Sequence, residues 1–323
     1  MDQPAFSVII PLYNYERYIA QAVKSVQAQT YPNFEIVICN DGSKDNGGAL
    51  ADELAAADSR IRVIHQPNAG LPAARNSAIR HARNPWLALL DADDQFFPDT
   101  LAHHAATITT NLAALFTHGY YHRLEPDGST TVLDGSFQST PTGPREYFDR
   151  VFLNPSCVCF HRDLLDRHGW FDERLKVSED YDLFLRFGRE TQYIPVKHPV
   201  CLRRRHGSNL SSQSGWTRTV EARVLERFVK AYNGNAFISP SQMKRRLARL
   251  YYSAGRQYLN AGFHEQALES LSRSIELNPT LKTRLFKVTA QIKRLTGNSV
   301  DEKKFPSMEP MAEAVVWNQH PDS

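Results

Sequence analysis

The chain has 323 residues, of which 41% are hydrophobic and 23% are charged, and its formal net charge is +3. These values are typical of an ordinary soluble protein with one large core or two domains. No apolar run approaches the roughly 20 residues that a membrane-spanning helix needs, so any membrane attachment of this sequence is expected to be peripheral.

The first residues and the cysteines predict a cytoplasmic protein. Met1 to Pro4 lead directly into a strand-like run, so no signal peptide is expected. The four cysteines lie among apolar neighbours and show no paired metal-ligand spacing, which favours buried, reduced thiols. They are Cys39, Cys157, Cys159 and Cys201.

The small net charge hides an asymmetry along the chain. Residues 1–100 contain twelve acids and eight bases, whereas residues 200–256 contain twelve Lys and Arg and only two acids. The basic segment suits a surface that faces phosphates or an anionic bilayer, and a solvated basic face is an equally good interpretation. Nucleic acid is not expected as a partner, because the aromatic–basic interleaving of single-strand binders is missing.

The first ninety residues alternate between apolar strands and helices. Strands are predicted at residues 6–11, 34–39, 61–64 and 86–90, and helices between them at 18–29, 47–57 and 71–82. This alternation indicates βαβ units and a parallel sheet. Right-handed crossovers would bring the loops after the strands to one edge. That edge collects Tyr13, Asp41, Asp45, Arg75, Asp91, Asp93 and Asp94.

The strand at residues 86–90 ends in three carboxylates within four positions, Asp91, Asp93 and Asp94. Ligands of open α/β sheets collect at the carboxyl ends of strands, and clustered carboxylates repel one another unless a cation lies among them. The pattern therefore predicts a divalent metal that holds a phosphate-bearing substrate. The alternative is an acidic loop that caps the next helix, which Pro98 could open.

A second set of elements is predicted beyond this strand. Helices are expected at residues 98–111 and 143–151, strands at 114–120 and 157–160, and an extended, solvent-facing segment at 129–137. A helix opens at Glu179 with Ser178 as its N-cap, and a strand near residues 200–202 precedes Arg203, Arg204, Arg205 and His206.

The C-terminal part is predicted to be helical and basic. Residues 251–279 have the small and aromatic positions of one tetratricopeptide repeat. Since about three repeats are needed for stability, this repeat should dock on the rest of the chain, on residues 281–295 or on a second copy. An apolar stripe on residues 281–295 either packs as a cap, which is preferred, or lies on a membrane surface. The predicted boundaries are 1–235, 236–296 and a mobile tail at 297–323.

Four motifs in the first half resemble one family in their order and spacing. They are Ser7 to Asn14 (SVIIPLYN), Asn40 to Asp45 (NDGSKD), Ala73 to Asn76 (AARN) and Leu90 to Asp94 (LDADD). Together they look like the signature of family 2 glycosyltransferases, over roughly residues 6–212. The resemblance implies an inverting enzyme of the GT-A fold, with a Rossmann-like, mostly parallel central sheet flanked by helices, followed here by a small helical region.

The resemblance implies roles for the residues that would bind the nucleotide. Pro11 and Tyr13 would shape the slot for the base, and Asp41 would accept from the N3–H of a uracil ring. Arg75 would reach the base or a phosphate as a fixed cation. Without the family, Asp41 would be assigned to an Asp-Gly turn and Arg75 to the surface.

The acidic motif resembles the family's DxD element, which binds Mn²⁺ or Mg²⁺ and the diphosphate. Asp93 is expected to meet the ribose or the metal, and Asp94 to be the more direct metal ligand. His206 would join the metal or a phosphate oxygen, and Arg204 would steady the diphosphate. Neutralising the departing nucleoside diphosphate would ease cleavage of the sugar–phosphate bond.

The pair Glu179-Asp180 resembles the family's acidic pair at the start of a late helix. Inverting transfer needs a base for the acceptor hydroxyl, so Asp180 is predicted as this base and Glu179 as a residue that positions the acceptor. The alternative is that both acids only stabilise the N-terminus of the helix.

These assignments predict a cytoplasmic, metal-dependent enzyme that moves a sugar from a UDP-sugar to a hydroxyl of a growing or lipid-linked glycan, as in bacterial surface polysaccharide or lipopolysaccharide synthesis. Peripheral membrane contact and homo-oligomerisation are further expectations. A nucleotidyltransferase, a catalytically silent binding module and an enzyme for a GDP- or dTDP-linked donor remain as alternatives.

Overall fold

The computed structural model describes residues 3–132, 139–205 and 214–296. The chain forms two compact units that divide at residues 207 and 208. This division precedes the predicted boundary at residue 235, because α8 (Ser214–Ala231) packs along α9 (Pro240–Asn260) within the second unit. His206, residues 133–137 of the predicted extended segment and the predicted tail from residue 297 lie outside the described residues.

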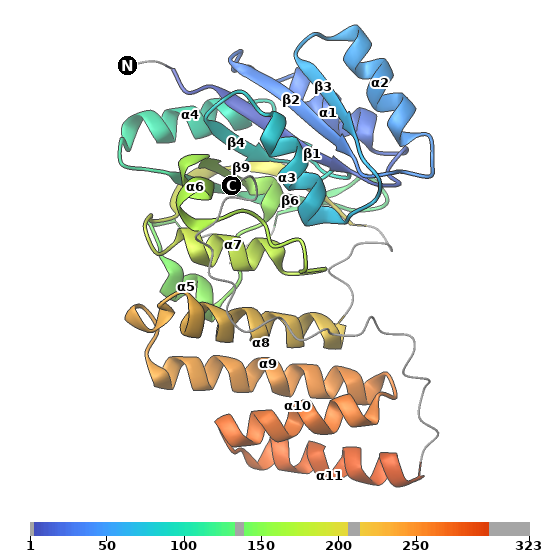
Figure 1. Cartoon of the computed structure of the whole chain (residues 1–323), viewed down its shortest axis with the longest axis vertical. Helices are drawn as coiled ribbons and strands as arrows, with labels where there is room; N and C mark the ends of the chain where they lie inside the picture. Colours follow the sequence, from blue (N-terminus) through green and yellow to red (C-terminus); the bar gives the residue numbers. More distant parts are fainter. Residues whose placement is uncertain (1–2, 133–138, 206–213, 297–323) are drawn as a thin grey trace. The chain divides into compact units, whose positions relative to one another are not determined.

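The first unit is built on a nine-stranded sheet of order β3-β2-β1-β4-β8-β6-β9-β5, with β7 paired to β6 (Figure 1). The strands are β1 (Phe6–Leu12), β2 (Phe34–Asn40), β3 (Ile61–His65), β4 (Trp86–Leu89), β5 (Gln95–Phe96), β6 (Phe116–Leu124), β7 (Thr130–Val132), β8 (Val158–His161) and β9 (Ile194–Arg204). Strands β1 to β4 are mutually parallel, as the sequence predicts. Beyond them the sheet is mixed, since β8 is antiparallel to both β4 and β6.

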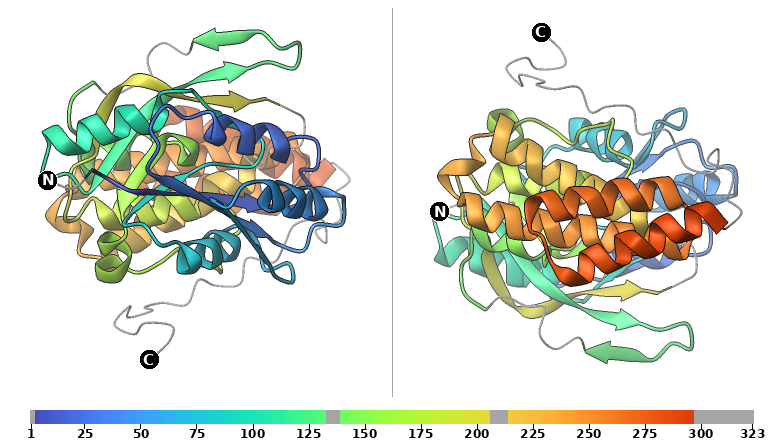
Figure 2. Two further views of the ribbon diagram at one scale, coloured as in Figure 1. Left: turned by 90° about the horizontal axis from the view of Figure 1, so that it is seen from above. Right: turned by 90° about the horizontal axis from the view of Figure 1, so that it is seen from below.

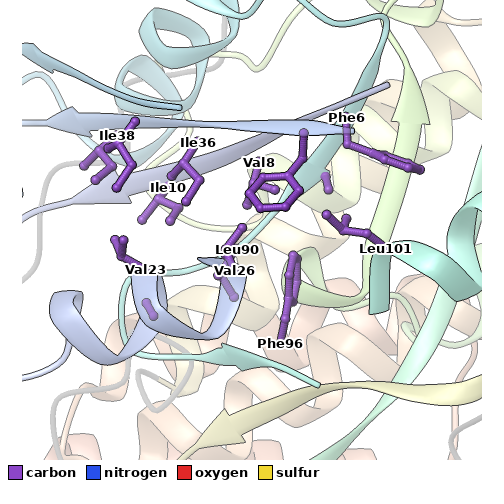
Figure 3. Packing of buried hydrophobic residues seen from close by; sticks show 14 of the residues in the cluster. Phe6, Val8, Ile10, Val23, Val26, Ile36, Ile38, Leu90, Phe96 and Leu101 are labelled. Atoms are coloured by element: carbon purple, nitrogen blue, oxygen red, sulfur yellow. The ribbon is translucent and has the colours of Figure 1, made fainter. Parts of the chain in front are cut away.

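The first half of the sheet is apolar on both faces. Every residue of β1 is buried, and β1 pairs with β2 in register from Phe6 with Phe34 to Leu12 with Asn40. Successive side chains point to opposite faces, so one face of this pair carries Val8, Ile10, Ile36 and Ile38. These residues pack with Val23 and Val26 of α1 (Ile19–Gln27), and with Leu101 of α4 (Thr100–Thr110), in one core cluster (Figure 3).

Six further helical elements belong to the described part of the first unit. They are α2 (Gly47–Ala57), α3 (Leu71–His81), α5 (Pro144–Asp149), the 3-10 helix η1 (Pro155–Cys157), α6 (Asp163–His168) and α7 (Glu179–Phe187). Helix α3 contacts β1 and β2, and α7 contacts α5 and α6.

Two short elements and one long strand differ from the sequence prediction. Neither β5 nor α6 was expected, because two and six residues are too few for a periodic pattern. Strand β9 begins at Ile194, although Pro195 and Pro199 argue against a strand there. The register of β9 against β6 shifts between His118 and Tyr121, and this irregularity accommodates the prolines.

The second unit consists of helices that pack in sequence. They are α8, the 3-10 helix η3 (Gly234–Ala236), α9, α10 (His264–Leu277) and α11 (Leu281–Thr296). A Cβ at Gly255 would lie 2.6 Å from Leu271 Cγ, so glycine permits the close approach of α9 and α10. Ser274 donates to the carbonyl of Ala248 at 2.8 Å across the same helix pair. None of the described helices combines the length and the apolarity needed to cross a membrane.

Candidate active site

The loops that follow β1 and β2 are tied to each other at the carboxyl edge of the sheet. The Asn14 N–H donates to Ser43 Oγ at 3.1 Å, and the Lys44 N–H donates to Asn14 Oδ1 at 2.8 Å. Asn14 has a φ of +58°, which Asn adopts more readily than most residues. Pro11 is buried within β1, whereas Tyr13 is 38% exposed at this edge and is therefore accessible to a ligand.

Asp41 holds the loop between β3 and α3. Its Oδ1 accepts from Gln66 Nε2 at 2.7 Å and from the Ala69 N–H at 2.9 Å, and its Oδ2 accepts from the Gly70 N–H at 2.9 Å. The residue is only 2% exposed. Asp41 therefore shapes the edge where α3 begins, and its predicted contact with a uracil ring stays a prediction.

Arg75 of α3 lies between two acidic segments. It is 1% exposed, and it donates from Nη2 to Asp91 Oδ1 at 2.8 Å and from Nη1 to Glu179 Oε1 at 2.6 Å. Its guanidinium also lies over the ring of Phe171, 5.4 Å from the centroid. Burial alone would lower the pKa of Arg75, but the charges of Asp91 and Glu179 outweigh it and raise the pKa.

The acid turn after β4 brings Asp91, Asp93 and Asp94 into electrostatic contact. Asp94 is 3% exposed, its Oδ2 accepts from Ser156 Oγ at 2.7 Å, and its Oδ1 accepts from the Arg204 N–H at 2.9 Å. Ser156 Oγ also accepts the Asp91 N–H at 3.1 Å. Burial, followed by the charges of Asp93 and Asp91, raises the pKa of Asp94 well above its ordinary value.

The acid turn offers carboxylate oxygens of the kind that divalent cations prefer. Across residues 3–132, 139–205 and 214–296, no three His, Cys, Asp or Glu side chains are grouped closely enough to hold a metal ion alone. Mg²⁺, however, is usually bound by one or two carboxylates together with substrate phosphates. Burial is the main cause of the raised pKa of Asp94, and the charges of Asp93 and Asp91 add to it; a cation among these carboxylates would favour the charged form. The donor set therefore fits Mg²⁺ or Mn²⁺.

Arg204 holds the same turn from β9. In addition to its N–H bond to Asp94, it donates from Nε to the Asp93 carbonyl at 3.0 Å and from Nη2 to Gln21 Oε1 at 2.7 Å. Its guanidinium lies 4.7 Å from the ring centroid of Tyr18. The pairing of β5 with β9 is what brings Arg204, more than a hundred residues later, to the acid turn.

The arginines on either side of Arg204 contact other residues. Arg203 lies over the ring of Tyr121 at 5.4 Å, and Arg205 lies 3.8 Å from a carboxylate oxygen of Glu125. Among Arg203, Arg204 and Arg205, hydrogen bonds to the acid turn are described for Arg204. Its predicted role at a diphosphate remains a prediction.

Helix α7 begins beside Arg75 and carries the predicted base. Ser178 occupies the N-cap position with a φ of +62°, an uncommon conformation for a residue other than glycine, and its side chain makes no capping bond. Glu179 is buried against Arg75. Asp180 is half-buried, and its Oδ1 accepts the Tyr181 N–H at 2.8 Å.

Asp180 has the acidity of a base that works near neutral pH. Burial, and then the charge of Glu179, raise its pKa to about 7; Asp91 adds to the effect, and Arg75 partly opposes it. A carboxyl group tuned in this way is suited to accept a proton from an alcohol.

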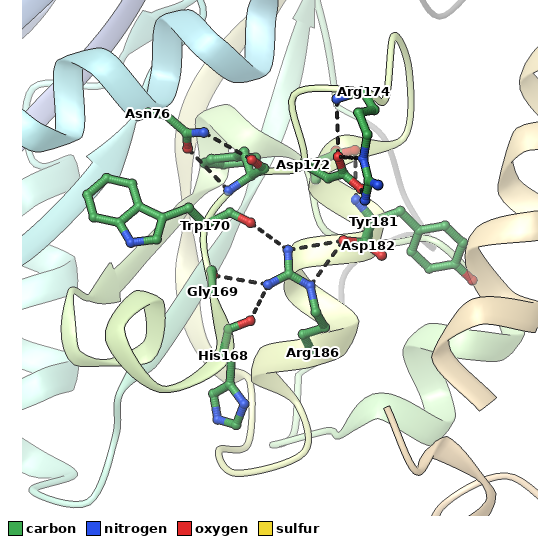
Figure 4. A network of polar contacts seen from close by, with 11 residues as sticks. Asn76, His168, Gly169, Trp170, Asp172, Arg174, Tyr181, Asp182 and Arg186 are labelled. Atoms are coloured by element: carbon green, nitrogen blue, oxygen red, sulfur yellow. Dashed lines mark hydrogen bonds and ion pairs between the residues drawn. The ribbon is translucent and has the colours of Figure 1, made fainter. Parts of the chain in front are cut away.

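A buried arginine fixes the orientation of α7 (Figure 4). Arg186 is 1% exposed and donates from Nε to Asp182 Oδ2 at 3.0 Å, one helical turn earlier. It also donates to the carbonyls of Gly169 at 3.0 Å, Trp170 at 2.7 Å and His168. One side chain therefore ties α7 to the loop before it.

The same loop is tied to α3 by Asn76. Its Nδ2 donates to the Phe171 carbonyl at 2.9 Å, and its Oδ1 accepts the Phe171 N–H at 3.2 Å (Figure 4). The Nδ2 also donates to Glu173 Oε1 at 2.9 Å. Next in the loop, the two carboxylate oxygens of Asp172 accept hydrogen bonds from Nε and Nη2 of Arg174, each at 2.8 Å.

Comparison with known proteins identifies the family. The sequence model described as "Glycosyl transferase family 2" matches residues 7–169, about half of the chain. The chain belongs to glycosyl transferase family 2. It is therefore a glycosyltransferase, and this membership sets aside the alternative of a nucleotidyltransferase.

Three proteins illustrate the relationship of this family 2 enzyme to others. EpsH of Bacillus subtilis (strain 168), named as a glycosyltransferase, is 46% identical over 248 residues, which span 73% of this chain and 69% of EpsH. The structure of S. aureus TarS 1-349 in complex with UDP-GlcNAc has a TM-score of 0.60 at 19% identity and covers 91% of this chain and 92% of that chain. The mannosyltransferase PcManGT from Pyrobaculum calidifontis, in complex with GDP-Man and Mn²⁺, has a TM-score of 0.55 at 19% identity and covers 91% and 81%. The two structures confirm the predicted GT-A fold.

The structure thus brings most of the predicted site residues to one region of the first unit. Arg75 connects Glu179 with Asp91, and Arg204 contacts Asp93 and Asp94, while His206 lies outside the described residues. Sequence reasoning gave no role to two buried residues. Ser156 lies in a 3-10 helix of three residues, which is too short for a periodic pattern, but Arg186 could have been found as the partner of Asp182 at helical i, i+4 spacing.

Proposed function

We propose that this enzyme transfers a sugar, with inversion, from a UDP-sugar to a hydroxyl of a growing or lipid-linked glycan, using Mn²⁺ or Mg²⁺ and Asp180 as the general base. The observation that carries the proposal is the bridge from Asp91 through Arg75 to Glu179. It joins the acid turn, which suits a cation and a diphosphate, to the helix that bears a carboxyl group with a pKa of about 7.

In the proposed step, Asp180 accepts the proton of the acceptor hydroxyl as the hydroxyl oxygen bonds to the anomeric carbon. The bond from that carbon to the phosphate oxygen breaks, and its electron pair leaves with UDP. Bound at Asp93 and Asp94, a divalent cation would neutralise charge on the leaving diphosphate. Arg204 would steady the same group, and Glu179, held by Arg75, would position the acceptor.

Pro11, Tyr13 and Asp41 are proposed to recognise the base. Tyr13 supports this proposal because its exposed ring lies at the edge that Asp41 shapes. A uracil donor is supported by the UDP-GlcNAc in the TarS complex, whereas the PcManGT complex holds GDP-Man, so a guanine donor is the second candidate. Bacterial surface polysaccharide or lipopolysaccharide is the proposed setting.

The test is a donor panel read out in two ways. Thermal unfolding is measured with UDP, GDP and dTDP, each with and without Mn²⁺, and nucleotide release is measured from the matching sugar donors. We expect UDP to raise Tm only when the metal is present, and a UDP-sugar to release UDP. Stabilisation by GDP with release from a GDP-sugar would transfer the proposal to the second candidate, and no response to any nucleotide would contradict both.

Asp180→Asn tests the base separately. We expect it to lower kcat at least 100-fold while UDP and Mn²⁺ still raise Tm, because general-base catalysis contributes roughly 100- to 10,000-fold. Asp166→Asn, on the exposed face of α6, is the matched control and should keep full activity. Unchanged kcat in Asp180→Asn would exclude this residue as the base.

A further inference from the structure

The last described helix exposes a continuous row of large apolar side chains. The apolar face of α11 consists of Leu281, Leu285, Val288, Ile292 and Leu295, whose exposed fractions range from 50% to 80%. Their spacing of four and three residues places them on one side of the helix. Isolated apolar residues on a surface need no explanation, but five in one row mark an interaction site.

The opposite side of α11 already packs against its neighbours. Thr283 and Ala290 are 4% and 0% exposed, and Phe286 meets the ring of Tyr252 of α9 edge-on, with centroids 5.6 Å apart. Helices α9, α10 and α11 lie side by side in Figure 1 and in the right-hand view of Figure 2. The sequence favoured packing of the apolar stripe, but in the described part of the chain the packed side of α11 consists of other residues, namely Thr283, Phe286 and Ala290.

Cations border the apolar face, and no acid interrupts them. Helix α11 contains five Lys and Arg and no Asp or Glu, and residues 214–296 as a whole contain fifteen Lys and Arg against five Glu. Arg294 is paired with Glu265 at 3.2 Å, whereas Arg284, Lys287 and Lys293 make no ion pair with another described residue. These three positive charges, which lie beside the apolar face, are therefore available to bind a partner.

We propose that α11 is a docking surface for an anionic phospholipid bilayer. A basic helix with an apolar side lies in the plane of the interface, with the apolar residues among the acyl chains and the Lys and Arg heads at the lipid phosphates. Charge complementarity selects this occupant. A second copy would bring Arg284, Lys287 and Lys293 against the same three cations, which opposes pairing of two α11 helices.

The experiment is vesicle flotation with the full chain. One set of vesicles contains phosphatidylcholine alone, and the other contains phosphatidylcholine with about 30% phosphatidylglycerol, an anionic lipid. We expect the protein to float with the anionic vesicles and not with the neutral ones. Raising the salt to about 0.5 M should weaken the binding, because screening shortens the reach of the charges.

Two variants and a control assign the binding to α11. The triple change Leu285→Ser, Val288→Ser and Ile292→Ser should abolish flotation, and since these side chains are exposed, it should leave Tm unchanged. The pair Arg284→Gln and Lys293→Gln should reduce partitioning roughly fivefold for each charge removed. The matched pair Lys244→Gln and Arg245→Gln, which are exposed on α9, should leave it within about twofold.

Three outcomes would overturn the proposal that α11 binds an anionic bilayer. Flotation of the triple variant at the level of the unchanged chain would overturn the proposal. So would a dimer, seen by light scattering and lost in the triple variant, without any vesicle binding, because α11 would then join two copies. Flotation that requires deletion of residues 297–323 would assign the apolar face to this segment of the chain and also overturn it.

Discussion

Asp91 and Glu179 lie on opposite sides of one buried guanidinium, with Arg75 donating to the first at 2.8 Å and to the second at 2.6 Å. The acid turn after β4 and the first turn of α7 are therefore held by the same side chain. A buried charge of this kind is stable only while its partners remain in place. Arg75 is thus expected to position both segments, in addition to the nucleotide contact that the family resemblance implies.

Replacement of Arg75 by Met should lower the free energy of unfolding by about 3–5 kcal/mol, because Glu179 is left buried without its partner. The rate is expected to rise with pH as Asp180 loses its proton, and this rise is called the acidic limb of the pH–rate profile. Arg75→Met should shift the acidic limb to higher pH, since the charge of Arg75 lowers the pKa of Asp180. Urea unfolding and initial rates across pH measure the two effects.

Arg75→Lys is the control for this prediction. It retains the charge, so the acidic limb should stay in place, but an ammonium cannot bridge two carboxylates as a guanidinium does, and kcat should still fall. An upward shift of the limb in Arg75→Lys equal to that in Arg75→Met would show that geometry, and not charge, sets the pKa of Asp180.

The pH dependence of catalysis should follow Asp180. A base must be deprotonated, so activity should rise with pH through the pKa of about 7 and level off above it. Initial rates from pH 5.5 to 9, at saturating donor and metal, measure this limb. Rates that stay constant from pH 5.5 to 8 would contradict the assignment.

The sequence was sufficient to predict the first four strands and the helices between them, because βαβ units carry strong apolar periodicity. Strands β1 and β2 are buried along nearly their whole length, and their ends place Tyr13 and Asp41 at one edge as expected. The motif order also singled out Asp180, which no periodic pattern would reveal, and its role as the base stays a prediction.

The contacts between distant segments could not be predicted in the same way. Strand β5 has two residues, yet its pairing with β9 brings Arg204 to the backbone and side chain of the acid turn. Ser156 reaches Asp94 from a 3-10 helix of three residues, which is too short for a periodic pattern. Such contacts depend on tertiary packing, which a local pattern does not encode.

The Arg186–Asp182 pair should be important for the stability of α7. Arg186→Met leaves Asp182 charged and buried, and we expect the free energy of unfolding to fall by about 3–5 kcal/mol. The double change Arg186→Met and Asp182→Leu should recover part of this loss, because the buried carboxylate is removed together with the arginine. Recovery should be incomplete, since the carbonyls of residues 168–170 still lack their donor. Urea unfolding of the unchanged chain and of both variants measures the recovery, and equal stability of the single and double variants would contradict it.

Ser156 should control the affinity for the metal through Asp94. Its hydroxyl donates to Asp94 Oδ2 at 2.7 Å and accepts the Asp91 N–H at 3.1 Å, so Ser156→Ala removes a bond that favours the charged carboxylate and loosens the turn. Partners that orient metal-binding groups typically contribute 10- to 100-fold to affinity, and we expect the Mn²⁺ concentration for half-maximal activity to rise by roughly tenfold or more.

Ser25→Ala is the matched control, because Ser25 Oγ likewise accepts a backbone N–H near the turn, from Phe96 at 3.0 Å, but has no described bond to a carboxylate. It should leave the Mn²⁺ titration unchanged. Ser156→Thr keeps the hydroxyl and should restore most of the affinity if its methyl group is accommodated. Superimposable Mn²⁺ titrations for Ser156→Ala and the unchanged enzyme would mean that Asp94 does not bind the metal, and the search for the ligand would turn to Asp93 and Asp91.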